Sequence, residues 1–132
     1  MTAPYRQVVL TSEAPAPIPV LSQALIHGGL VYCSGQVGAD PKTGKLVEGD
    51  VTDRAKQVLE NLSSVLKAAG TSLHNAVKVN VFLDDIANFA KVNEVYAQYF
   101  NSDPKPVRTC VAVKQLPLNT DVEIELIAAL PQ

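Results

Sequence analysis

The sequence predicts a single α+β domain, residues 1–132, in which two helices cover one face of a mixed β-sheet. Three observations lead to this fold class. The chain has 132 residues, 47% of them hydrophobic and 18% charged, which suits one globular domain. Its strand-like and helix-like segments follow the order βββαβαββ, and no repeat or linker divides them. The last strand alternates apolar and polar residues, which gives the sheet two chemically different faces.

The first third of the chain predicts three short strands. Residues 5–10 form the first, and the proline-rich residues 14–19 must then form an extended connection, because each proline fixes φ and removes an N–H. Residues 22–26 and 30–34 form a hairpin, since the intervening pair Gly28-Gly29 supplies the positive φ of a tight turn.

Residues 51–69 predict the longest helix. Asp50 can cap its start, and Gly70 can end it. Its apolar residues recur with the 3.6-residue period of one helix face. This stripe consists of Val51, Ala55, Val58, Leu59, Leu62, Val65, Leu66 and Ala69.

Residues 76–83 alternate as a strand with one buried face, and a second helix follows them. Asp84 or Asp85 can cap this helix, and Asp103-Pro104 must stop it. Its inward stripe consists of Ile86, Phe89, Val92, Tyr96 and Phe100.

Residues 109–113 and 122–129 predict the last two strands, which we expect to pair antiparallel through residues 115–119. The sheet face that the helices leave uncovered carries apolar residues, namely Phe82, Ile127 and Ala129. An uncovered face of this kind indicates subunit contact.

Charge and composition exclude several classes of protein. The formal charge is −2 and no basic block is present, so we expect no nucleic-acid partner. The apolar runs are short and the first residues lack the order of a secretory signal, so we expect a cytoplasmic chain without a membrane partner. Nucleotide, phosphate and metal signatures are absent, which predicts no cofactor and no metal. We expect His27 and His74 to be solvated surface residues.

The remaining candidates for chemistry lie near the C-terminus. If the last two strands pair, Cys110 comes close to Glu123 or Leu126. Arg108 would clamp a carboxylate there while Glu123 orients a water; the alternative is a structural Arg–Glu pair. A cysteine in a strand with no histidine in reach is more often a small buried hydrophobe than a nucleophile.

The turn Ser34-Gly35-Gln36 has two interpretations as well. Its hydroxyl and main-chain N–H groups can meet a ligand, because glycine has no Cβ to keep the ligand away. A plain exit from a strand into a turn explains the same residues.

Taken together, several segments resemble the RidA family (YjgF/YER057c/UK114) of reactive enamine/imine deaminases, with details closest to fungal members. The resemblance spans nearly the whole chain. The segments are Ser22-Gln-Ala24, Val31-Tyr-Cys-Ser-Gly-Gln36, Asp40-Pro-Lys-Thr-Gly44, Val77-Lys-Val-Asn-Val-Phe-Leu83, Phe89-Ala-Lys-Val-Asn93, Pro106-Val-Arg-Thr-Cys-Val-Ala-Val113 and Val122-Glu-Ile-Glu125.

The resemblance implies a chorismate-mutase-like fold whose sheets pack into a homotrimeric barrel, with sites in the clefts between subunits. It also implies hydrolysis of 2-aminoacrylate, 2-iminobutyrate and related acids to 2-keto acids and ammonia, without metal or cofactor. By similarity, Arg108 binds the substrate carboxylate and Glu123 orients water. The other site residues that it implies are Gly35 and Cys110, through main-chain hydrogen bonds, and Ser34 and Asn93, which line the cleft.

One position departs from the family pattern. Leu21 stands where the family commonly has a site tyrosine, which makes that wall of the pocket more apolar and predicts an altered rate or substrate preference. Two other functions stay open: a ribonuclease or translation inhibitor, and a non-catalytic ligand-binding or chaperone-like trimer. The mitochondrial matrix stays open as a compartment beside the cytosol.

Overall fold

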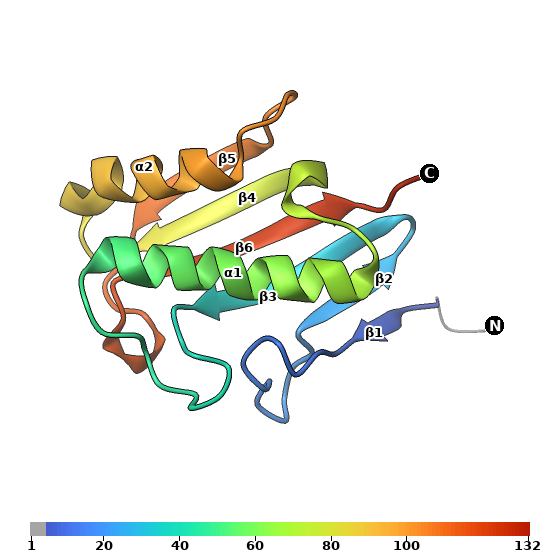
Figure 1. Cartoon of the computed structure of the whole chain (residues 1–132), viewed down its shortest axis with the longest axis horizontal. Coiled ribbons are helices and arrows are strands. Elements are labelled where there is room, and N and C mark those ends of the chain that lie inside the picture. The colour runs from blue at the N-terminus through green and yellow to red at the C-terminus, as the bar shows by residue number, and fades with distance from the viewer. Residues whose placement is uncertain (1–4) are drawn as a thin grey trace.

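The computed structural model describes residues 5–132, and it builds them into one six-stranded sheet with two helices on one face (Figure 1). The predicted α+β class and the order of strands and helices are therefore confirmed. The elements are β1 (Gln7–Val9), β2 (Ala24–His27), β3 (Leu30–Val37), α1 (Val51–Ala69), β4 (Ala76–Leu83), α2 (Phe89–Tyr99), β5 (Val107–Ala112) and β6 (Val122–Ala129), with short 3-10 turns at Leu73–Asn75, Ile86–Asn88 and Pro117–Asn119.

The strands lie in the order β1-β2-β3-β6-β4-β5, and every neighbouring pair is antiparallel except β4 and β5. The predicted pairing of the last two strands is therefore wrong, because β4 lies between β5 and β6. The physical reason is burial. Every second residue of β6 is fully buried, which suits a central strand, whereas β5 leaves most of its residues exposed and occupies an edge.

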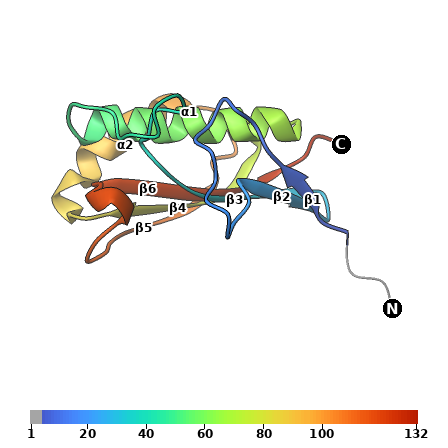
Figure 2. The same ribbon diagram turned by 90° about the horizontal axis from the view of Figure 1, so that it is seen from below.

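Helix α1 matches its prediction at both ends. Asp50 accepts a hydrogen bond from the main-chain N–H of Thr52, the Asp53 carboxylate accepts one from the Asp50 N–H, and Gly70 ends the helix at φ 92°. Its apolar stripe packs on the sheet, so the core is the layer between the helices and the strands (Figure 2).

Helix α2 matches its prediction only in part. Val92, Tyr96 and Phe100 lie in or against the core as expected, whereas Ile86 and Phe89 are 53% and 41% exposed. The helix also ends at Tyr99, before the aspartate and proline that were expected to stop it. Because the sheet ends at β5, the start of α2 has no core to cover.

The other face of the sheet carries no helix (Figure 2). Phe82, Ile127 and Ala129 are half-buried there, as the alternation predicted, and Tyr32 and Val111 are exposed. This face is thus partly apolar, and no helix covers it in a single chain. Neither helix of residues 5–132 combines the length and the apolar character that a membrane crossing requires.

A two-pronged ion pair fixes the start of β6 against α1. Arg54 donates through Nε and Nη2 to the two carboxylate oxygens of Asp121, at 2.8 and 2.7 Å, and also donates through Nη1 to the carbonyl of Gly49 at 2.9 Å. Both side chains are only 18% exposed. Hydrogen bonds to charged groups contribute about 1.5–3 kcal/mol each. This pair therefore helps to hold Glu123, two residues further on, in register.

Candidate active site

Glu123 lies on the uncovered face of β6, beside a β-bulge in β3. The ladder between these strands shifts there, so Ser34 and Gly35 together stand opposite the single residue Glu125. A bulge leaves main-chain groups unpaired with the neighbouring strand and re-aims nearby side chains. The expected exit from a strand at Ser34 is wrong, because β3 continues through the bulge to Val37.

Gly35 provides the space that the Glu123 carboxylate occupies. A Cβ at position 35 would lie 2.7 Å from Oε2 of Glu123, which is closer than real Cβ contacts come. The carboxylate therefore rests against bare main chain. A side chain at position 35 would therefore force the Glu123 carboxylate to move.

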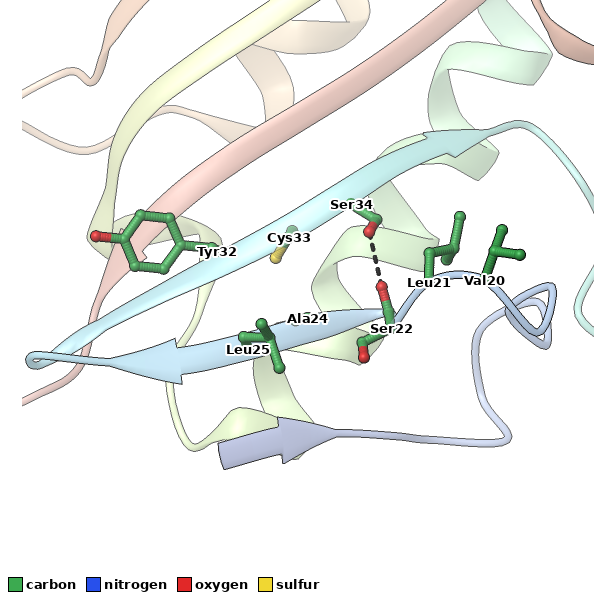
Figure 3. A pocket seen from close by; sticks show the side chains of 8 residues that line it. All are labelled: Val20, Leu21, Ser22, Ala24, Leu25, Tyr32, Cys33 and Ser34. Atoms are coloured by element: carbon green, nitrogen blue, oxygen red, sulfur yellow. Dashed lines mark hydrogen bonds between the residues drawn. The ribbon is translucent and has the colours of Figure 1, made fainter. Parts of the chain in front are cut away.

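Ser34 connects this strand to the loop that carries Leu21. Its Oγ donates to the carbonyl of Ser22 at 2.7 Å (Figure 3). Its N–H donates to the carbonyl of Gln23 at 2.9 Å. The Ser34 hydroxyl already donates its proton, so toward a ligand it can act only as a hydrogen-bond acceptor.

Four predicted site residues, Leu21, Ser34, Gly35 and Glu123, line one cleft of about 650 Å³. A volume of this size is typical of a small-molecule site. Leu21 also borders a smaller recess of about 380 Å³, shown in Figure 3. The apolar walls of the larger cleft come from Pro15, Pro17, Ile18, Pro117 and Leu118.

The surroundings of Glu123 make its carboxyl a weaker acid than an ordinary glutamate. Burial raises the pKa of this carboxyl above its ordinary value of 4.5, and the negative charge of Glu125 raises it further. Within residues 5–132 no lysine or arginine pairs with Glu123. A carboxyl with a raised pKa is suited to accept and return a proton near neutral pH.

Arg108 belongs to a second cluster, on the opposite face of the sheet. On β4, Arg108 stands beside Val79, whereas Glu123 stands beside Phe82; positions 79 and 82 point to opposite faces. The expected closeness of the arginine strand and Glu123 is therefore wrong within one chain. The alternative of a structural Arg–Glu pair is wrong there as well, and for the same reason.

Helix α2 supplies the contacts of Arg108. Nη1 of Arg108 donates a hydrogen bond to Oδ1 of Asn93 at 2.6 Å. Cζ of Arg108 lies 4.6 Å from the ring centroid of Tyr96 and 5.5 Å from that of Phe89. Sequence reasoning placed both aromatic residues in the inward stripe of the helix; Tyr96 does pack against the core, whereas Phe89 is exposed. The spacing of positions 89, 93 and 96 could have predicted this cluster, because residues that are four and three positions apart lie on one face of a helix.

Cys110 lies on the same side of β5 as Arg108. It is half-buried against the core, and burial raises the pKa of its thiol. Burial also raises the pKa of the Cys33 thiol, to about 12. Both thiols are thus protonated at neutral pH, which agrees with the interpretation of Cys110 as a small hydrophobe. His27 and His74 are exposed, as expected.

Comparisons with known proteins identify the family. The model of the family Endoribonuclease L-PSP matches residues 11–130. The chain belongs to this family. Among Endoribonuclease L-PSP relatives, Protein HMF1 of Saccharomyces cerevisiae is 49% identical over 92% of each chain. The 2-iminobutanoate/2-iminopropanoate deaminase of Rattus norvegicus is 46% identical over 97% of this chain and 93% of its own.

Solved structures of the Endoribonuclease L-PSP family share the fold. Yeast Mmf1 has a TM-score of 0.93 at 43% identity and covers 96% of this chain and all of its own. RidA from the Antarctic bacterium Psychrobacter sp. PAMC 21119 has a TM-score of 0.89 at 44% identity, over 94% and 99% of the two chains. The resemblance to the RidA family is therefore confirmed. The roles of individual site residues stay predictions.

The electrostatics of Glu123 generate a prediction about its titration. Glu125→Gln removes the neighbouring negative charge, so the pKa of Glu123 should fall toward 4.5 while staying above it, because burial persists. Carbon-13 NMR titration of the labelled glutamate carboxyls measures this change. Glu94→Gln, an exposed change on α2, is the control and should leave the Glu123 titration in place. A wild-type pKa at or below 4.5, or no fall in Glu125→Gln, would contradict the account.

Proposed function

We propose that this chain hydrolyses small 2-imino and 2-enamino acids to 2-keto acids and ammonia. One observation carries the proposal. Neither of the two groups that the chemistry needs is neutralised by a charged partner within residues 5–132: Arg108 touches no carboxylate, and Glu123 touches no cation. The identity to the rat 2-iminobutanoate/2-iminopropanoate deaminase supports the same reaction.

The proposal includes a homotrimer, because the two groups lie on opposite faces of one sheet. Arg108, on the edge strand β5 of one subunit, would meet Glu123 on the uncovered face of its neighbour. Three apolar residues of this face, Phe82, Ile127 and Ala129, are half-buried in one chain and would be covered by assembly. When three subunits form a closed ring through identical head-to-tail contacts, each interface contains Arg108 from one subunit and Glu123 from the next.

The reaction needs only positioning and proton transfer. Arg108 holds the substrate carboxylate, while Glu123 takes a proton from water as the water oxygen bonds to the C=N carbon. That proton passes to the nitrogen and gives a carbinolamine. Glu123 then moves the hydroxyl proton to the nitrogen as well, the C–N bond breaks, and a keto acid and ammonia result. An enamine enters this sequence as its imine tautomer.

Leu21 is proposed to set the preference for the substrate side chain. It is 46% exposed and borders both the larger cleft and the smaller recess. With Ile18 and Leu118 it makes one side of the larger cleft apolar. An apolar wall stabilises an apolar side chain by removing it from water. We therefore expect a preference for imino acids with longer apolar side chains.

The family description also names an endoribonuclease. A site for RNA needs a basic surface that tracks phosphates. The charged residues that line the larger cleft are Lys42 and Glu123, so the cleft has one lysine rather than a basic surface, and the whole chain has a formal charge of −2. Imine hydrolysis therefore fits these residues better than RNA cleavage does.

Three substitutions test the assignment of catalytic roles. Arg108→Ala should lose nearly all activity, and Glu123→Gln should lose about 10²–10⁴-fold, as expected for a general base. Cys110→Ala should keep substantial activity, because water is the nucleophile. The assay is ammonia release from 2-iminobutyrate generated in place by an amino-acid oxidase, above the rate without the chain. An inactive Cys110→Ala beside an active Glu123→Gln would move the protein to nucleophilic catalysis.

A second assay tests the role of Leu21. We expect Leu21→Tyr to lower the ratio of kcat/KM for the leucine-derived imine over the 2-aminobutyrate-derived imine by about tenfold, because a hydroxyl replaces part of the apolar wall. Val20→Tyr is the matched control, since Val20 borders only the smaller recess. The same ratio in wild type and Leu21→Tyr would show that this residue does not choose the substrate.

A further inference from the structure

The side of α2 that faces β5 surrounds Arg108 with groups that attract a cation without neutralising it. We propose that Tyr96 and Phe89 are positioning residues, which hold the Arg108 guanidinium oriented for a carboxylate. The site thereby becomes selective for anionic ligands. This inference rests on the proposed function, in which Arg108 binds the substrate carboxylate.

The geometry matches cation–π contacts on two rings. The distances from Cζ of Arg108 to the ring centroids of Tyr96 and Phe89, 4.6 and 5.5 Å, lie within the 6 Å or so at which an aromatic face attracts a guanidinium. The amide oxygen of Asn93 fixes one further point, Nη1. Two rings and one amide therefore fix the position of the planar group.

The contrast with Arg54 shows what these contacts leave available. Arg54 donates to both oxygens of Asp121, so its charge is already paired. Arg108 donates one hydrogen bond within the described part of the chain, and its acceptor is the neutral amide of Asn93. A guanidinium has five N–H donors, so an edge of Arg108 stays free for a two-pronged contact with a carboxylate.

The aromatic support is itself held in place. The Tyr96 ring stacks on Phe100 with centroids 4.3 Å apart, and Phe100 is only 3% exposed. Burial also raises the pKa of the Tyr96 hydroxyl, so this ring carries no negative charge at neutral pH that would pair with Arg108. A fixed guanidinium loses less conformational entropy when a ligand binds, which strengthens binding without any added contact.

The test measures equilibrium binding of 2-ketobutyrate, a keto acid that carries the carboxylate and needs no turnover. Tyr96→Leu removes the aromatic face, and we expect the Kd by calorimetry to rise about tenfold, while Tyr96→Phe stays within about threefold of wild type. In the imine assay, Tyr96→Leu should raise KM with little change in kcat, because the carboxylate is held equally before and during the reaction. Binding of the methyl ester of 2-ketobutyrate, which has no charge, should not respond.

Tyr99→Leu is the matched control. Tyr99 lies on the same helix, is half-buried, and donates its hydroxyl proton to Glu60 rather than contacting Arg108. This variant should lose stability yet keep the wild-type Kd. If Tyr96→Leu does not fold, Phe89→Leu replaces it, since Phe89 is 41% exposed and its loss opens no core.

The outcomes separate this inference from the proposed function. A wild type that binds 2-ketobutyrate but does not hydrolyse imines refutes the proposed function, and the weaker binding of Tyr96→Leu would still support the positioning role. Equal keto-acid affinity of wild type and Tyr96→Leu overturns the inference. If Tyr99→Leu weakens the binding of 2-ketobutyrate as much as Tyr96→Leu does, the inference is overturned as well, because the effect is then structural. A wild type that does not bind 2-ketobutyrate also overturns the inference.

Discussion

The strict alternation along β6 is the constraint on which the rest of this molecule depends. Its four even-numbered residues from position 122 to position 128 are buried under the helices, and this burial places β6 in the middle of the sheet. The residues between them must then face the uncovered side. Glu123 is one of these, so the same pattern that builds the core also places a carboxylate on the face that no helix covers.

The three arginines of the chain illustrate how surroundings decide the role of a charge. Arg54 meets Asp121 in a mostly buried two-pronged pair, and this pair stabilises the junction of α1 and β6. Arg108 is held by two rings and an amide, so its charge stays available for a ligand. Arg6 is exposed. Residue type alone does not distinguish a structural arginine from a binding one, because the distinction lies in the partner.

Local features of the fold could be predicted from the sequence. The period of residues 51–69, the Asp50 cap and the Gly70 stop all act within a few residues, and the structure confirms each. The position of β5 could not be predicted, because strand pairing joins residues far apart in the chain. The same limit hid the bulge at Ser34 and Gly35, which appears only when β3 is set against β6.

The candidate site shows the same division. The resemblance implied which residues belong to the site, but only the sheet order shows that Arg108 and Glu123 lie on opposite faces of one chain. Phe89 was wrongly expected in the core for a different reason, whereas Tyr96 packs against the core as expected. In the sequence, an apolar stripe that covers the core has the same spacing as one that contacts a guanidinium. In α2, part of the stripe contacts the guanidinium of Arg108 on the edge strand β5.

The central claim is that one active site takes Arg108 from one subunit and Glu123 from another. The most direct measurement is complementation between the two inactive variants: Arg108→Ala and Glu123→Gln chains are unfolded, refolded together, and assayed for imine hydrolysis. Each mixed trimer contains one interface with both intact groups, so we expect about a quarter of the wild-type activity from an equal mixture. Activity no higher than that of the two variants refolded separately would contradict the claim.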